Sequence, residues 1–149
     1  MTNKITNLIN DKVRQDYATS SGSATHARMQ HVFFDDTGVA LSDDDIVAHI
    51  AQNPELVEYM GPLSKTEVPI AGYVNGRFIS RRIDRLYVNH TTKTVVIIDY
   101  KTDLDKERFY NKYIEQLTEY RRLMVDIHPG YTIACKILWL NDFTLENVI

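Results

Sequence analysis

Two charged side chains stand at the end of an apolar run in the middle of the chain. The segment 94–103 reads Thr-Val-Val-Ile-Ile-Asp-Tyr-Lys-Thr-Asp. Its four consecutive Val and Ile residues predict a strand buried on both faces, because only such a strand is apolar at every position. Asp99 and Lys101 are two residues apart, so they project from the same face of that strand. The pair is either an ordinary strand end whose charges reach solvent, or a carboxylate and an amine held together for chemistry.

A second carboxylate lies on the strand predicted just before this one. The segment 82–86 reads Arg-Ile-Asp-Arg-Leu, which places Ile83 on one face and Asp84 on the other. An aspartate inside a strand is disfavoured and requires a specific partner. An ion pair with a flanking arginine is one possibility, and a divalent cation shared with Asp99 is the other.

The residue patterns around these charges predict helices first and strands afterwards. Apolar periodicity and helix-start residues predict helices at 4–17, at 20–34, at about 43–50 and from 53 onward. Alternation and turn residues predict strands at 66–73, 77–88, 94–100 and 131–140, the first three joined as a meander. The three aspartates at 43–45 are interpreted as a complement to a helix dipole and not as a metal site.

A long helix is predicted at 106–126, between the last two strands. Its apolar stripe follows helical spacing and is interpreted as core. Gln116 and Tyr120 are four residues apart, so an amide and a phenol lie on neighbouring turns and both can reach the same end of the sheet. Because the helix forms a crossover, the strand 131–140 can lie parallel to the strand 94–100.

Length and composition limit the kind of protein. The chain has 149 residues, 44% hydrophobic and 25% charged, which fits one globular domain. Its apolar runs are far shorter than a membrane span and residues 1–7 form no secretory h-region, so we expect a soluble, cytoplasmic protein. The single cysteine, Cys135, lies in an apolar segment and is interpreted as a buried, inert thiol. A net charge of -3 argues against a uniformly basic surface for nucleic acid but leaves room for a local basic path.

Several motifs in a fixed order make the chain resemble a family of nucleases. The motifs are Gly22-Ser-Ala-Thr-His26, Asp84 within Ile-Asp-Arg, Asp99-Tyr-Lys101 and Gln116-Leu-Thr-Glu-Tyr120. They match the order and rough spacing of the RecB-like, or AddA-like, nuclease domain of the PD-(D/E)xK superfamily, from about Ser20 to the end of the chain. The resemblance implies an α/β, restriction-endonuclease-like core in which helices flank a mixed central β-sheet. Residues 1–149 are then one nuclease domain, with a mainly helical part at 1–62 that carries His26 and the sheet, long helix and last strand at 64–149.

The same resemblance implies a divalent-metal-dependent enzyme that hydrolyses phosphodiester bonds of DNA. An oxygen-bound Mg²⁺ or Mn²⁺ can activate water and neutralise charge on the phosphate. By resemblance, the metal ligands are His26, Asp84, Asp99 and the carbonyl oxygen of Tyr100. The catalytic residues are Asp84, Asp99 and Lys101, of which Lys101 orients the attacking water and stabilises the developing charge. The residues expected to support the site or to contact the DNA strand are Gln116, Tyr120, Glu67 and Arg85.

The expected biological setting also follows from the resemblance. Such domains act as exonucleases in DNA repair and recombination and accompany a helicase. The sequence holds no Gly-x-x-x-x-Gly-Lys-[Ser/Thr] phosphate loop, so a helicase motor would be a separate subunit or domain. The expected partners are therefore DNA and a helicase, and no membrane. An alternative is a catalytically decayed module of the same fold that binds DNA or a subunit, although the presence of all the expected ligands argues against decay.

Overall fold

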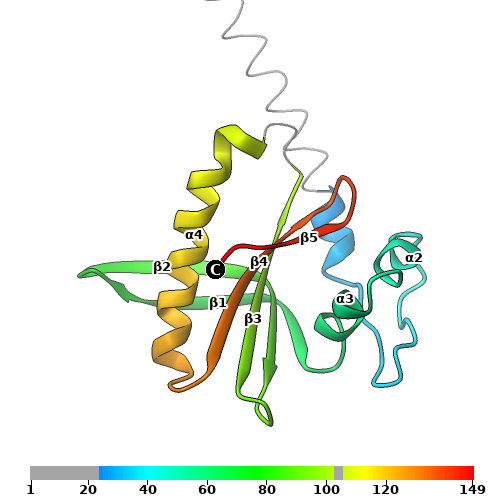
Figure 1. The fold of residues 1–149 in the computed structure, drawn as a ribbon, viewed down its shortest axis with the longest axis horizontal. Coiled ribbons are helices and arrows are strands. Elements are labelled where there is room, and N and C mark those ends of the chain that lie inside the picture. The colour runs from blue at the N-terminus through cyan, green and yellow to red at the C-terminus, as the bar shows by residue number, and fades with distance from the viewer. Residues whose placement is uncertain (1–23, 103–105) are drawn as a thin grey trace, which may run out of the picture.

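The computed structural model describes residues 24–102 and 106–149. A short helix at 24–29 comes first. The elements that follow are α2 (Ile46–Ile50), α3 (Pro54–Tyr59), β1 (Ser64–Val74), β2 (Arg77–Asn89), β3 (Thr94–Lys101), α4 (Lys106–Ile127), β4 (Thr132–Trp139) and β5 (Thr144–Asn147). The order of helices before strands agrees with the sequence patterns, and Figure 1 shows the resulting arrangement.

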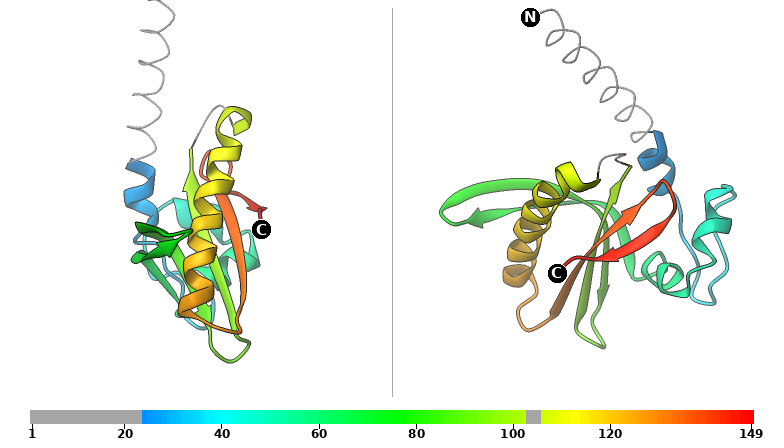
Figure 2. Two further views of the ribbon diagram at one scale, coloured as in Figure 1. Left: turned by 90° about the vertical axis from the view of Figure 1, so that its left-hand side faces the viewer. Right: turned by 45° about the horizontal axis from the view of Figure 1, so that its top comes forward.

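The five strands form one mixed sheet in the order β1-β2-β3-β4-β5. The pairs β1/β2, β2/β3 and β4/β5 are antiparallel, whereas β3 and β4 are parallel. The long helix α4 provides the crossover between the parallel strands and packs against one face of the sheet (Figures 1 and 2). The chain is thus an α/β protein, and the predicted meander and the predicted parallel last strand are both confirmed.

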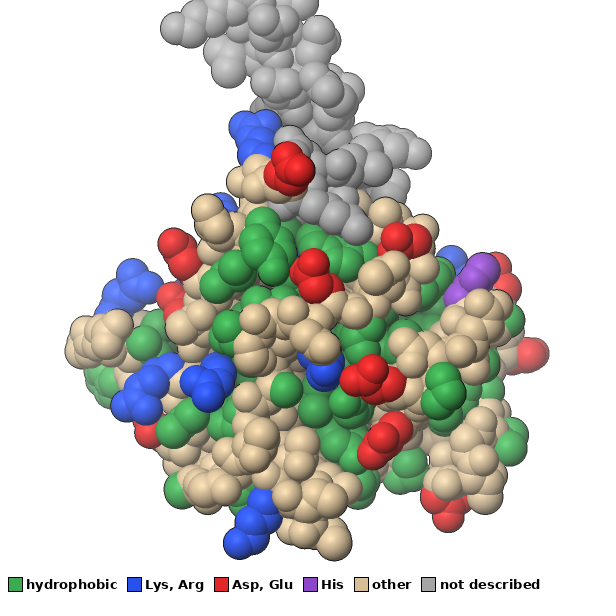
Figure 3. Space-filling view, in the orientation of Figure 1, with side chains coloured by type: hydrophobic (Ala, Val, Ile, Leu, Met, Phe, Trp, Pro, Cys, Tyr) green, Lys and Arg blue, Asp and Glu red, His purple; other side chains and the backbone are tan. Residues whose placement is uncertain are grey.

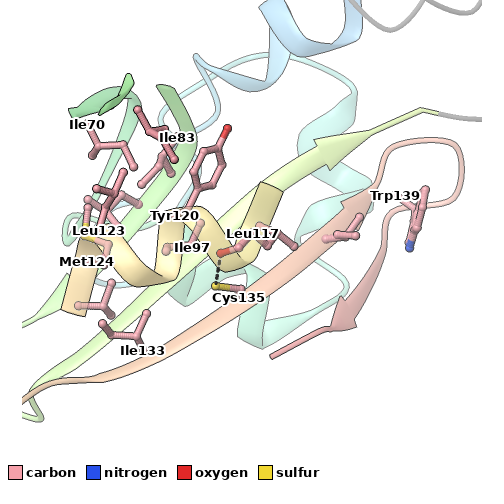
Figure 4. Close-up of a cluster of buried hydrophobic side chains, with 14 residues drawn as sticks. Ile70, Ile83, Ile97, Leu117, Tyr120, Leu123, Met124, Ile133, Cys135 and Trp139 are labelled. Carbon is pink, nitrogen blue, oxygen red and sulfur yellow. Dashed lines mark hydrogen bonds between the residues drawn. The ribbon is translucent and has the colours of Figure 1, made fainter. Parts of the chain in front are cut away.

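The sheet has a separate hydrophobic core on each face, which explains why β3 is apolar at each position from Val95 to Ile98. Val95 and Ile97 belong to the cluster beneath α4, shown in Figure 4. Val96 and Ile98 belong to a second cluster, formed with residues 29–60 of the N-terminal part. The buried thiol of Cys135 lies in the first cluster, where burial raises its pKa to about 12, so it stays protonated as the sequence predicts.

The distal half of the β1–β2 hairpin leaves the sheet as a two-stranded ribbon. The pairing of β2 with β3 covers Arg85–Asn89 only, whereas its pairing with β1 continues to the turn at residues 75 and 76. We call residues 69–82 the arm, and Figure 1 shows it extending beyond α4. A Cβ atom at Gly72 would lie 2.8 Å from Cδ2 of Leu123, so the missing side chain lets α4 rest directly on the arm.

Three predicted details differ from the structure. The helix predicted to reach Phe34 ends at residue 29, and Phe34 instead forms an antiparallel bridge with Ala40. Asp44 accepts a hydrogen bond from the amide of Ile46 at the start of α2, as a helix-start residue does, and it also accepts one from the side chain of Arg28, an ion pair that was not predicted. The strand β5 was not predicted.

Two of the remaining helix predictions are confirmed, and one lies outside the described residues. The helices predicted from residues 43 and 53 are confirmed as α2 and α3, and Asn53 caps α3 by accepting a hydrogen bond from the amide of Glu55. The helix predicted at 4–17 lies outside the described residues. None of the helices in the described part of the chain is long and apolar enough to cross a membrane.

Candidate active site

Asp99 and Lys101 face α4 together at the carboxyl end of β3. The Lys101 Nζ atom lies 2.8 Å from Oδ2 of Asp99, whose side chain is only 5% exposed. This contact is an ion pair, and within the described residues Oδ2 accepts no hydrogen bond of regular geometry. Lys101 directs its hydrogen bond to Oε1 of Gln116 instead, at 3.1 Å. A buried carboxylate oxygen next to a cation is therefore left with acceptor capacity, which a ligand could use.

Asp84 reaches the same point from the neighbouring strand β2. Its Oδ2 atom accepts a hydrogen bond of 2.8 Å from the backbone amide of Tyr100. Burial, the adjacent charge of Asp99 and a hydrogen bond between the two side chains together raise the pKa of the Asp84 carboxyl to about 8. In the metal-free protein, Asp84 therefore holds its proton to a higher pH than an ordinary aspartate does. Neither arginine that flanks Asp84 in sequence pairs with it, so the ion-pair interpretation is wrong.

An irregularity in the β1–β2 pairing gives Asp84 this position. The paired residues on either side are Thr66 with Arg85 and Val68 with Ile83, and Glu67 and Asp84 between them do not pair. Glu67 has a φ of 53°, which is uncommon for a residue with a side chain. The regular alternation of faces breaks here, because Ile83 lies in the core beneath α4 and Arg85 lies on the opposite side.

Arg85 is completely buried, so of the two roles expected for it, the DNA contact is excluded and support of the site remains. Its guanidinium donates hydrogen bonds to the backbone carbonyls of Met29 and Val32 at 2.9 and 2.8 Å. Its Nε atom donates to the hydroxyl of Tyr100 at 2.9 Å. Arg85 thus connects β2 and β3 to the last residue of the helix at 24–29 and to the segment that follows it.

The helix at 24–29 carries His26 to the end of β3. The Nε2 atom of His26 lies 2.9 Å from the carbonyl oxygen of Tyr100, and Nδ1 lies 3.9 Å from Oδ1 of Asp84. The imidazole also meets the Tyr100 ring edge-on, with ring centroids 5.5 Å apart. Three elements therefore bring together the residues that the sequence resemblance selects as metal ligands.

The helix α4 holds Lys101 through a chain of hydrogen bonds. Gln116 accepts from Lys101 and donates through Nε2 to the hydroxyl of Tyr120 at 2.7 Å. That hydroxyl in turn donates to the backbone carbonyl of Arg82 at 3.4 Å. Burial raises the pKa of Tyr120 to about 12, so the phenol remains a donor across the physiological range. The prediction that Gln116 and Tyr120 reach the same end of the sheet is confirmed.

Two other side chains border the site. Lys101 lies over the ring of Tyr113, with Nζ 4.4 Å from the ring centroid. Sequence reasoning treated Tyr113 only as a core residue, because its helical spacing matches the apolar stripe. Glu67 points its carboxylate towards Arg82, at 3.6 Å, so it borders the site next to Asp84 without joining the carboxylate pair.

The donor set is suitable for a hard divalent cation. Among the described residues, no group of three or more His, Cys, Asp and Glu side chains could by itself hold a metal ion. Mg²⁺, however, usually uses only one or two carboxylates and completes its octahedron with water and substrate phosphate. Asp84 and Asp99 supply two carboxylates, the Tyr100 carbonyl adds a third oxygen, and His26 adds a nitrogen that favours Mn²⁺ somewhat. The residues present therefore fit Mg²⁺ or Mn²⁺.

Comparison with known proteins does not identify the chain. No known family matches it, and none of the curated proteins shows significant similarity to it.

Proposed function

We propose that this protein is a divalent-metal-dependent DNA nuclease of the PD-(D/E)xK type. The observation that carries the proposal is the cluster at the end of β3, where the buried carboxylate of Asp99 lies 2.8 Å from the ammonium of Lys101 and next to the largely buried carboxylate of Asp84. Buried acids forced together are costly to keep ionised, and such pairs occur mainly where a cation or a reaction requires them.

Each residue has a defined task in phosphodiester hydrolysis. Asp84, Asp99, the Tyr100 carbonyl and His26 would hold Mg²⁺ or Mn²⁺, which when bound lowers the pKa of water and neutralises phosphate charge. Lys101, fixed by Gln116, orients the attacking water and stabilises negative charge as the oxygen of that water bonds to phosphorus. The bond from phosphorus to the leaving ester oxygen then breaks, and a proton of the water ends on that oxygen.

We further propose that the enzyme acts as an exonuclease in DNA repair or recombination and receives its substrate from a helicase. This part of the proposal is supported only by the order of motifs from Gly22 to Tyr120, which resembles RecB-like domains. A decayed binding module is the less favoured alternative, because Asp84, Asp99 and Lys101 are all present and meet at one point.

An assay with end-labelled single-stranded and double-stranded DNA tests the proposal. We expect cleavage with Mg²⁺ or Mn²⁺, none in excess EDTA, and none by Asp99→Asn with either metal. Asp126→Asn is the matched control, since Asp126 is an exposed carboxylate on α4 that contacts only Arg122 at 3.5 Å. Full cleavage in EDTA, or normal cleavage by Asp99→Asn, would overturn the proposal.

A further inference from the structure

We infer that the outer face of the arm binds single-stranded DNA and leads it to the carboxylate pair. This inference rests on the proposed function, because it concerns the substrate of the same site. The outer face is the side of the arm that points away from α4. Its residues are all exposed: Pro69, Ala71, Tyr73, Phe78, Ser80 and Arg82.

Two aromatic rings stand on this face without any cover. Tyr73 and Phe78 are 69% and 59% exposed, and they are direct cross-strand partners. Their ring centroids are 5.5 Å apart and the rings meet edge-on. Large exposed aromatic side chains are costly in water, and adjacent rings are the typical platform on which the bases of a single strand stack.

Arginines line the arm next to the rings. Arg82 lies on the outer face with its side chain 68% exposed. Arg77 and Arg81 lie on the α4 side, where Glu119 pairs with both at 3.3 and 3.4 Å. Figure 3 shows Lys and Arg side chains gathered on the side of the molecule where the arm and α4 lie. Aromatic rings beside cations match a partner that combines bases with phosphates, and this charge complementarity favours DNA over a purely apolar partner.

The outer face ends at the candidate site. By strand alternation, Phe78, Ser80 and Arg82 follow one another on the outer side of β2, and Asp84 comes two residues later, where the alternation breaks and its side chain meets Asp99. Phe78 and Asp84 are six residues apart, a span of about 20 Å along a strand. The small residues Ala71 and Ser80 lie between the rings and Arg82, so this stretch has no large side chain to obstruct a strand. A strand that stacks on the rings would therefore pass Arg82 and arrive at Asp84.

Binding is measured with the full chain and a fluorescein-labelled oligothymidine in EDTA, where the proposed metal is absent. Loss of one stacked base costs about 1–3 kcal/mol, so we expect Tyr73→Ala and Phe78→Ala each to weaken affinity about tenfold. Phe78→Trp should retain affinity and Phe78→Leu should lose it, since stacking requires a ring. Arg82→Gln should lower the slope of log affinity against log salt by about 0.7. The control is Leu41→Ala, because Leu41 is equally exposed, at 68%, in the segment before α2 on the other side of the molecule.

A second readout separates this inference from the proposed function. A small chromogenic phosphodiester reaches the carboxylate pair but not the rings, so the Tyr73→Ala and Phe78→Ala variants should hydrolyse it at the wild-type rate and show a raised KM only for oligonucleotides. Wild-type affinity for oligothymidine in both ring variants, or no binding by the wild type, overturns the inference even if cleavage occurs. Conversion of a dimer to a monomer by these variants, with DNA affinity unchanged, would show that a second copy covers the face. Binding that depends on the rings in a protein that cuts nothing would support the inference and contradict the proposed function.

Discussion

Not all of the side chains at the end of β3 can bind a cation. Asp84 and Asp99 carry acceptor oxygens, whereas the ammonium of Lys101 has only donors. Lys101 contacts Asp99, Gln116 and the ring of Tyr113. Substitution of the amine should therefore affect chemistry without removing a ligand.

Lys101→Ala is expected to bind Mn²⁺ with nearly wild-type affinity and to lose cleavage by at least about a hundredfold. Asp99→Ala is expected to lose both, because it removes a ligand. Calorimetric titration with Mn²⁺ and a cleavage assay on the same preparations make the comparison. Equal losses of metal affinity in the two variants would show that Lys101 acts mainly by shaping the acid pair.

His26 lies within the helix at 24–29 and His31 lies just after it, so the two histidines can be compared as a matched pair. Only His26 reaches the Tyr100 carbonyl, at 2.9 Å, while His31 is exposed and contacts Gln30. We expect His26→Ala to weaken Mn²⁺ binding about tenfold or more and His31→Ala to leave it unchanged. Identical titration curves for the two variants would remove His26 from the set of ligands.

The acid pair makes the stability of the metal-free protein depend on pH. The pKa of Asp84 rises from 3.8 to about 8 on folding, so between these values the folded state binds more protons than the unfolded state. The free energy of unfolding therefore contains a contribution that decreases as pH rises from about 4 to 8 and is constant above that. Asp84→Asn should remove this decrease, which urea unfolding in EDTA at pH 5 and pH 8 would measure. An equal change in the variant and the wild type would assign the effect to other groups.

At the level of elements, Arg85 joins the N-terminal part to the sheet. Its guanidinium satisfies two carbonyls, of Met29 and Val32, beyond the helix that carries His26. Arg85→Ala should lower the free energy of unfolding by about 3 kcal/mol or more, since it removes the guanidinium donor from both carbonyls and leaves Met29 only the amide of Val32. Arg82→Ala on the same strand is the control and should cost about 0.5 kcal/mol, because its ion pair is exposed. A small loss for Arg85→Ala in chemical denaturation would mean that water replaces the guanidinium.

Strong periodicity made most elements predictable, whereas the failures have local physical causes. The strands β1 to β4 and the helix α4 carry long apolar patterns that burial on one or two faces requires. The strand β5 spans only Thr144–Asn147 and contains one apolar residue, Leu145, so no pattern marks it. The helix at 24–29 ends early because the chain then turns, and Phe34 pairs with Ala40 and donates its amide to Met60.

The candidate site was predictable to a similar extent. Spacing alone placed Asp99 beside Lys101, and the meander brought Asp84 next to them. The position of His26 came only from the resemblance, because one histidine carries no periodic signal. The burial of Arg85 could not be predicted, since alternation fails where Glu67 adopts a positive φ.

For the whole molecule, net charge would set how tightly the proposed DNA substrate is held. The chain has 17 Lys and Arg residues against 20 Asp and Glu residues. Glu119 and Glu67 partly neutralise the arginines of the arm. We therefore expect weak and steeply salt-dependent binding, and distributive cutting unless a motor feeds the strand. Degradation of a long substrate by the chain alone, at near-physiological salt with a competitor trap, measures this, and processive digestion there would show that no feeder is required.

Because only part of β2 pairs with β3, the backbone amides of β2 fall into two groups that exchange their protons through different motions. Amide protons at 85–87 lie between two neighbouring strands, so their hydrogen exchange requires opening of the sheet itself. Amide protons at 77–83 belong to a ribbon paired with β1 alone, and they can exchange by fraying from the turn while the rest stays folded. Asp84 lies at the boundary between the two regions. The arm can thus loosen and close many times while the candidate site stays intact, and a melting temperature would not report that motion.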